Sequence, residues 1–240
     1  MKFKISKTKE EVALNFSRYL AILIANREEV HIALSGGSTP KIVFDELAAN
    51  FQSDIDWSGV HLYWGDERCV EPTDEQSNYK MTDEHLISKI SIPEENIHRI
   101  KGENEPEYEA KRYEEFLKES LPKVNSIPQF DLVILGMGDD GHTASIFPHE
   151  IELWGSDKYC EVAVHPDSGQ KRVSLTGRII NNADTVAFLV TGKSKTEKFK
   201  EIKNQSGDYK NYPASLVNPS SGRLLWFLDE VAAGITSAQS

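Results

Sequence analysis

Residues 130–145 read FDLVILGMGDDGHTAS, and this stretch decides the fold. An almost unbroken apolar run passes directly into a turn of glycine, aspartate and histidine. A continuous apolar run is typical of a strand that is covered on both faces, as in a parallel sheet. The stretch therefore predicts a buried parallel strand with a polar turn at its carboxyl end.

The same alternation extends along the chain in both directions. Strand-like runs cover residues 30–36, 60–66, 130–138, 160–165, 185–192 and 223–229, and helix-like patterns cover residues 40–50, 77–90, 105–120 and 195–202. Prolines between these segments mark helix ends and loops. Strands that alternate with helices predict an α/β fold: a doubly wound, mostly parallel, Rossmann-like sheet with helices on both faces, in a single domain over residues 1–240.

Four polar motifs follow the predicted strands. They are SGGSTP at 35–40, GDER at 65–68, GMGDDGHTAS at 136–145 and TGKSK at 191–195. The carboxyl ends of parallel strands share one edge of the sheet, and ligands bind in the crevice there. We therefore expect all four motifs to meet in one cleft.

Composition narrows the classes of function. Hydrophobic residues make up 39% of the chain and charged residues 27%, and the formal net charge is −11. A chain so acidic is not expected to bind nucleic acid, so an anion site must be built from local cations and N–H groups. We find no secretory signal, no membrane-length apolar run, and only two cysteines, Cys69 and Cys160, without disulfide or metal spacing. These features predict a soluble cytoplasmic protein.

The glycine-rich motif SGGSTP predicts a phosphate site. Gly36 and Gly37 permit a tight turn, and Ser38 or Thr39 can cap the following helix, with Pro40 suited to its first turn. Free N–H groups and the helix dipole then attract an anion. A capped turn without any ligand is the alternative, and the three other motifs at the same edge favour phosphate.

Several cations are candidates for the same ligand. Arg68 can hold a phosphate with two parallel hydrogen bonds, and Asp66 can orient a substrate hydroxyl or a water molecule. Lys195 lies where a helix is expected to begin, while Arg172 and Arg178 can add positive charge. For each of them, a solvent-exposed salt bridge is the alternative.

His142 is the candidate catalytic base, because a neutral imidazole titrates near neutral pH and Asp140 lies two residues before it. The literal G-x-G-x-x-G at 136–141 is not interpreted as a dinucleotide site, since its two aspartates would repel a pyrophosphate. No G-x-S-x-G elbow and no paired histidine spacing occur, which disfavours a serine hydrolase and a metal enzyme. We therefore expect neither a metal nor another cofactor.

In this order, the motifs resemble the 6-phosphogluconolactonase family, which shares its fold with glucosamine-6-phosphate deaminases. The resemblance rests on SGGSTP, WGDERCV with SNY, FDLVILGMGDDGHTASIFP, RVSLT with IN, TGKSK and YPASLV. It implies hydrolysis of 6-phospho-D-glucono-1,5-lactone, without a cofactor, in the oxidative pentose phosphate pathway. It also implies His142 as the base, and the glycine-serine loop, Arg68, Lys195 and, less directly, Arg172 around the phosphate.

Two alternatives stay open. A glucosamine-6-phosphate deaminase would typically carry Tyr where this chain has Arg68, and Glu before the proline, where it has Phe147. A sugar-phosphate-binding domain without catalysis would not need His142. The sequence also leaves open whether Asp140 or Asp66 orients the imidazole or the water, what Arg178 does, and the oligomeric state.

Overall fold

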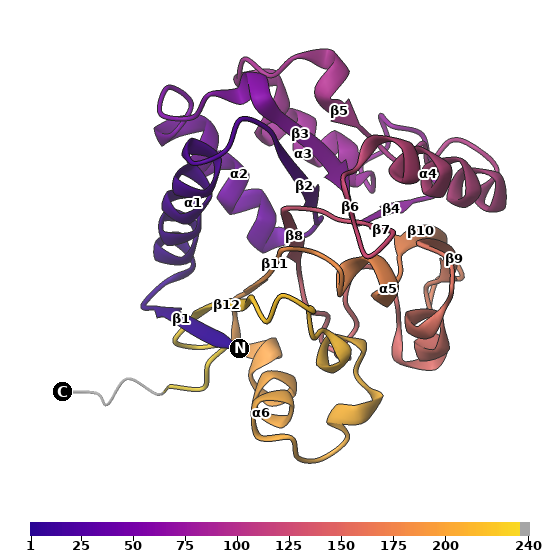
Figure 1. The fold of residues 1–240 in the computed structure, drawn as a ribbon. Coiled ribbons are helices and arrows are strands. Elements are labelled where there is room, and N and C mark those ends of the chain that lie inside the picture. The colour runs from indigo at the N-terminus through magenta and orange to yellow at the C-terminus, as the bar shows by residue number, and fades with distance from the viewer. Residues whose placement is uncertain (236–240) are drawn as a thin grey trace.

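A seven-stranded sheet, parallel throughout, forms the centre of the fold (Figure 1). The computed structural model describes residues 1–235. In spatial order, the strands are β1 (Lys2–Ser6), β12 (Leu224–Asp229), β11 (Thr185–Val190), β8 (Leu132–Leu135), β2 (Val30–Leu34), β3 (Val60–Trp64) and β5 (Ile97–His98). Every residue of β2, β8 and β11 is buried, which explains their continuous apolar sequences.

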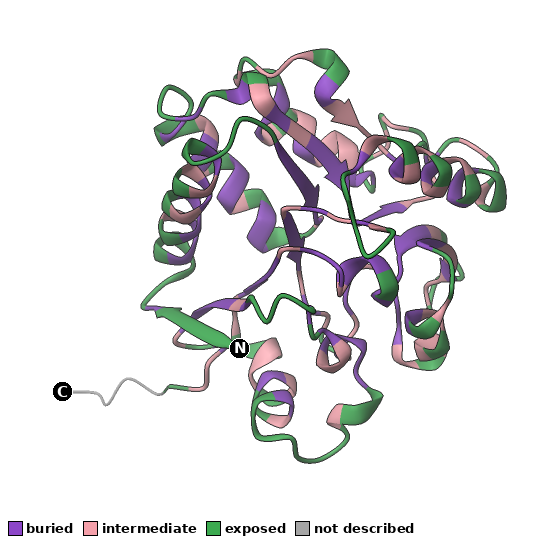
Figure 2. Cartoon of the chain, viewed as in Figure 1, coloured by how far each residue is buried: buried purple, intermediate pink, exposed green. Residues whose placement is uncertain are grey.

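Helices cover both faces of this sheet, as predicted. They are α1 (Lys9–Ala25), α2 (Ser38–Asn50), α3 (Asn78–His85), α4 (Pro106–Ser120), α5 (Gly177–Ile180) and α6 (Thr196–Asn204). On one face, α1 lies beside α2 and its Phe16 ring packs on Phe227, with the ring centroids 5.1 Å apart. On the other face, α4 and α6 pack on Tyr63 and Trp226. Buried segments therefore run through the middle of the molecule, between partly exposed helices (Figure 2).

A second, three-stranded antiparallel sheet lies beside the main sheet and corrects two predictions. It contains β4 (Asp66–Arg68), β10 (Lys171–Leu175) and β9 (Cys160–Val164). Residues 160–165 were expected in the parallel sheet, and the GDER motif at 65–68 was expected to follow a strand rather than to form one. Because β4 is short and polar and pairs with β10 far along the chain, local periodicity carries no sign of it.

The remaining differences concern shorter elements. The helix expected over residues 77–90 ends at His85, because Leu86 leaves the helical conformation with φ of −137°, and a 3₁₀ turn follows. The strand β1 and the helix α1 lie outside the predicted elements. A small hairpin joins β6 (Lys123–Val124) to β7 (Ile127–Pro128). The 3₁₀ helices cover Trp57–Gly59, Ile87–Lys89, Glu94–Asn96, Pro148–Gly155, Lys193–Lys195, Tyr209–Asn211 and Pro213–Leu216.

The point where the direction of winding reverses lies between β2 and β8. After β2 the chain continues to β3 on one side, whereas after β8 it continues to β11 on the other side. The loops that leave β2 and β8 therefore separate at their carboxyl ends and leave a crevice between them. Both the glycine-serine motif and the histidine motif occupy these loops.

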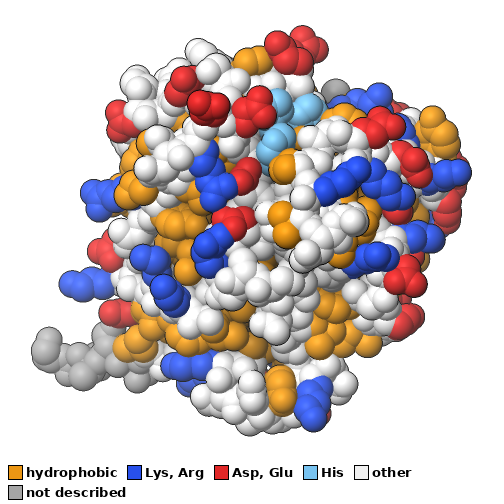
Figure 3. Space-filling model, in the orientation of Figure 1, with side chains coloured by type: hydrophobic (Ala, Val, Ile, Leu, Met, Phe, Trp, Pro, Cys, Tyr) orange, Lys and Arg blue, Asp and Glu red, His pale blue; other side chains and the backbone are white. Residues whose placement is uncertain are grey.

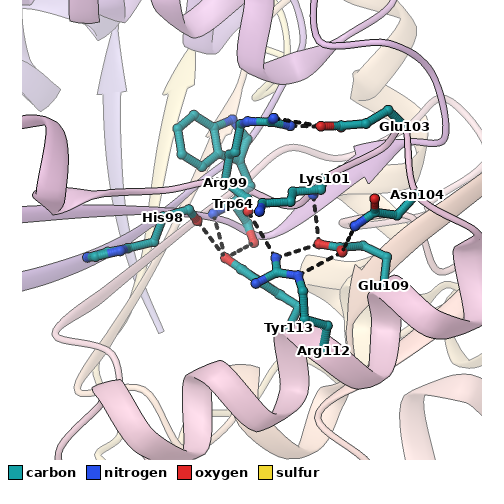
Figure 4. Close-up of polar contacts among 9 residues, drawn as sticks. All are labelled: Trp64, His98, Arg99, Lys101, Glu103, Asn104, Glu109, Arg112 and Tyr113. Carbon is teal, nitrogen blue, oxygen red and sulfur yellow. Dashed lines mark hydrogen bonds and ion pairs between the residues drawn. The ribbon is translucent and has the colours of Figure 1, made fainter.

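Buried polar groups attach the helix α4 to the end of β3 and to the 99–104 loop (Figure 4). The Tyr113 hydroxyl accepts a hydrogen bond from the Trp64 N–H at 3.0 Å. The buried Glu109 carboxylate accepts hydrogen bonds from Lys101 N–H, Asn104 and Arg112. This fixes the 99–104 loop, where a Cβ on Gly102 would lie 2.3 Å from the Arg68 carbonyl oxygen. The 99–104 loop therefore packs closely against the backbone of Arg68.

Three histidines form a cluster away from the crevice, and a group of histidine side chains is visible on the face drawn in Figure 3. His31 stacks on His61, with ring centroids 4.9 Å apart, and His61 stacks on His98 at 5.4 Å. His61 Nδ1 and His98 Nε2 share a hydrogen bond of 3.1 Å. Burial and the neighbouring imidazoles lower the pKa of His98 to about 4 and also lower that of His31. The two carboxylates that line the same hollow, Glu29 and Asp131, do not offset this.

These pKa shifts predict a loss of stability in mild acid. An unfolded histidine takes up a proton below pH ~6.5, whereas native His98 stays neutral down to about 4, so the free energy of unfolding falls as the pH falls between these values. Urea unfolding at several pH values should show this fall in the wild-type chain and a smaller one in His98→Asn. The exposed His149, replaced in the same way, serves as the control. An undiminished fall in His98→Asn would contradict the assignment.

Candidate active site

The four predicted motifs do meet in one cleft, of about 220 Å³, at the carboxyl ends of the central strands. Every predicted site residue except Asp140 and Arg178 lines it: Gly36, Gly37, Ser38, Thr39, Asp66, Arg68, His142, Arg172 and Lys195. The cleft also contains residues that the sequence did not single out, among them Ser35, Asn78, Met137, Ala144 and Thr191.

His142 is held by a compact turn after β8. The Gly138 N–H donates to the His142 carbonyl at 2.8 Å, and His142 Nδ1 lies 2.7 Å from Asp140 Oδ1. A Cβ on Gly138 would come within 2.1 Å of His142 Nδ1, so this close approach requires glycine. Because a carboxylate only accepts, Nδ1 must carry the proton, which leaves the lone pair on Nε2. The Phe147 ring packs against the imidazole at 4.6 Å between centroids.

Asp140 lies behind His142, outside the cleft lining. Burial raises the pKa of Asp140, but hydrogen bonds from the imidazole and N–H of His142, together with the attraction of its charge, outweigh burial and lower the pKa to about 2. The carboxylate is therefore ionised at neutral pH. An ionised carboxylate on Nδ1 both fixes the ring and stabilises its protonated form.

Asp66 takes a different partner, which distinguishes the two aspartates that the sequence left as alternatives. Its Oδ2 accepts a hydrogen bond from Ser145 Oγ at 2.6 Å, and both residues are buried. The Ser145 N–H in turn donates to Ser174 Oγ of β10 at 3.1 Å. Asp140 is thus the carboxylate on the imidazole, while Asp66 lines the cleft from β4. Ser145 lies in the GHTAS motif, three residues after His142, but nothing in the sequence indicated that it binds Asp66.

The glycine-serine loop differs in detail from the predicted cap. Gly37, with φ of 109°, is the N-cap of α2, and Ser38 and Thr39 are the first two helical residues. The expected side-chain cap by Ser38 or Thr39 is therefore wrong, because a glycine-only backbone conformation already begins the helix. Pro40 does lie in the first turn, as predicted. The first N–H groups of a helix have no partner within it, so this end can receive an anion.

Glu67, for which the sequence indicated no role, ties the start of α3 to β4. The residue is 2% exposed, and its carboxylate accepts hydrogen bonds from the backbone N–H groups of Arg68, Asn78 and Tyr79 and from Ser77 Oγ. Burial raises the pKa of Glu67, while these donors act in the opposite direction. The Asn78 amide donates to the Asp66 carbonyl, and a Cβ on Gly36 would lie 1.9 Å from Asn78 Oδ1. The SNY motif at 77–79, whose three residues all donate to Glu67, was the part of the sequence that could have indicated these contacts.

Two arginines line the cleft, and each has a donor without a hydrogen-bond partner among the described residues. Arg68 donates from Nη1 to the Gln76 carbonyl, and Arg172 has a long contact of 3.4 Å with Ser145 Oγ. The Nε atoms of both side chains are buried and have no partner within residues 1–235. Burial first, and then the charge of Arg68, lowers the pKa of Arg172. Neighbouring cations with unused donors are typical of an anion-binding site.

The other predicted cations divide into two groups. Lys195, at the N-cap of α6, lines the cleft and forms an ion pair with Asp139. Arg178 lies elsewhere, in an ion pair of 3.3 Å with Asp157. Across residues 1–235 no group of three or more His, Cys, Asp or Glu side chains is arranged to hold a metal ion. Over the same residues, no helix is long and apolar enough to cross a membrane.

Residues 5–226 match the family of glucosamine-6-phosphate isomerases and 6-phosphogluconolactonases. The chain is 46% identical to the 6-phosphogluconolactonase of Haemophilus influenzae over 204 residues, 85% of this chain and 86% of the relative. Among solved structures, devB protein superposes with a TM-score of 0.93 at 40% identity, covering 98% and 99% of the two chains. The 6-phosphogluconolactonase from Trypanosoma brucei gives 0.87 at 26% identity, covering 98% of each.

Proposed function

The chain belongs to the glucosamine-6-phosphate isomerase and 6-phosphogluconolactonase family, and we propose that it hydrolyses 6-phospho-D-glucono-1,5-lactone to 6-phospho-D-gluconate in the oxidative pentose phosphate pathway. The observation that carries this proposal is His142, which lines the same cleft as three cations and has its Nδ1 2.7 Å from Asp140 Oδ1. The pair can activate water, and the cations suit a phosphorylated substrate.

His142 is the proposed catalytic base. Its Nε2 takes a proton from a water molecule, which attacks the C1 carbonyl of the lactone. The oxyanion that forms is stabilised by nearby N–H groups or by a cation. When the tetrahedral intermediate collapses, the C1–O5 bond breaks and His142 returns the proton to the ring oxygen. Asp140 keeps the imidazole in the required tautomer, and Asp66 orients the water or a substrate hydroxyl.

The cations and the start of α2 are proposed to hold the 6-phosphate. The N–H groups of Ser38 and Thr39 are the first in the helix, and Arg68 has an unused donor. Lys195 and Arg172 line the same cleft. A phosphate gripped at one end of the substrate holds C1 in place at the other end, so binding remote from the reaction provides orientation.

A specific contact argues against deamination. Phe147 stands where a deaminase would typically have glutamate, and its ring is buried between His142 and the Arg172 guanidinium. A carboxylate that supports opening of the sugar ring is therefore replaced by an apolar surface. The alternative of a binding domain without catalysis gives no reason for the aligned carboxylate–imidazole pair.

We also propose that the reaction needs no metal or other cofactor, because a lactone is an activated ester that an imidazole-bound water can attack. The cytoplasm is the proposed location, in keeping with the two cysteines, both free thiols. We propose no nucleic-acid or membrane partner. The sugar phosphate is the partner that the cleft fits.

Replacing His142 tests the proposed mechanism. His142→Asn removes the base, so kcat for the phosphorylated lactone should fall by about 10²–10⁴-fold, with folding largely unchanged. Acid release above the spontaneous rate measures the turnover, and urea unfolding measures the stability. His149→Asn, in an exposed histidine outside the cleft, is the matched control. Near-normal turnover by His142→Asn would rule out this mechanism.

The phosphate contacts predict a separate effect. Charge-assisted hydrogen bonds contribute roughly 1.5–3 kcal/mol each, so plain gluconolactone should be a poorer substrate by on the order of 10³-fold in kcat/KM. Arg68→Ala should lower kcat/KM strongly for the phosphorylated lactone and little for the plain one. Lys195→Ala should do the same, more mildly. If either substitution slows both substrates equally, that residue does not bind the phosphate.

A further inference from the structure

Lys195 differs from the other cations of the cleft in already having an anionic partner. Its ammonium forms an ion pair with the Asp139 carboxylate, whereas Arg68 and Arg172 form no such pair within residues 1–235. The Lys195 side chain is 22% exposed and that of Asp139 is 68% exposed. A phosphate that binds the Lys195 ammonium must therefore displace the Asp139 carboxylate or bind beside it.

The backbone geometry determines which partner can move. Asp139 lies in the 138–142 turn, closed by hydrogen bonds from Gly138 N–H to the His142 carbonyl and from Gly141 N–H to the Gly138 carbonyl. The Ala214 N–H binds the Gly141 carbonyl from outside the turn at 3.1 Å, and the Tyr212 ring packs against Gly141. Asp139 is thus presented by a fixed loop, whereas Lys195 has four rotatable methylenes.

We propose that Asp139 is a specificity-determining residue that competes with the substrate phosphate for the Lys195 ammonium. This inference rests on the proposed phosphate site. With Asp139 in place, Lys195 is neutralised in the empty cleft, so a singly charged anion gains little there. A dianionic phosphate gains enough from Lys195, Arg68 and the start of α2 to displace the carboxylate. The same competition weakens the hold on the phosphorylated product and favours its release.

The test is the substitution Asp139→Asn in the full chain, with inorganic phosphate as the probe. Removing the competing charge should tighten phosphate binding, measured by calorimetry, by about twofold to fivefold, the range that an exposed ion pair can account for. KM for the phosphorylated lactone should fall in the same proportion. Binding of chloride, followed as competition with phosphate, should strengthen as well.

Two further variants separate competition from other effects. Asp157→Asn removes the same charge from the exposed pair with Arg178, outside the cleft, and should leave phosphate binding unchanged. In a Lys195→Ala background, Asp139→Asn should have no effect on phosphate binding, because nothing remains to compete for. Unchanged or weaker phosphate binding by Asp139→Asn, equal tightening in Asp157→Asn, or tightening that persists without Lys195 would each overturn the proposal. If the wild-type chain bound phosphate but hydrolysed no lactone, the proposed function would fail and this competition would still be measurable.

Discussion

The parallel pairing of β2 with β8 is the constraint on which the rest of the site depends. These two strands send the chain in opposite directions, so the loops at their carboxyl ends separate and leave space between them. One loop brings the start of α2 and the other brings His142. If β2 and β8 were not neighbours, an anion site and a base would still exist, but they could not act on the two ends of one small molecule.

Acidic residues of the cleft region have separate tasks because each has a different partner. Asp140 binds the imidazole, Asp66 binds Ser145, and Glu67 collects four donors and holds the turn before α3. Buried carboxylates are costly unless they are fully hydrogen-bonded, and the two buried ones, Asp66 and Glu67, are each bound by a neighbouring part of the site. Because these carboxylates already have hydrogen-bond partners, they do not form ion pairs with Arg68 and Arg172. Each of these two arginines keeps a donor without a partner within residues 1–235, as a site for an anion requires.

The central strands and the meeting of the four motifs could be predicted, because continuous apolar runs and the edge rule of parallel sheets are local and general signals. The second sheet could not, since β4 is three polar residues that pair with β10 over a hundred positions later. For the same reason, sequence spacing showed that Asp140 and Asp66 were both candidates but could not say which one binds His142. The cap at Gly37 was missed because serine and threonine are the usual caps and the glycine conformation depends on the packed loop.

Phe147 beside His142 and the cations of the cleft favour hydrolysis of a phosphorylated lactone over deamination of an amino sugar. The most direct measurement gives the purified wild-type chain both substrates, following acid release from 6-phospho-D-glucono-1,5-lactone and ammonia release from glucosamine 6-phosphate. We expect acid release far above the spontaneous rate and no ammonia. Ammonia release without acceleration of lactone hydrolysis would contradict this expectation.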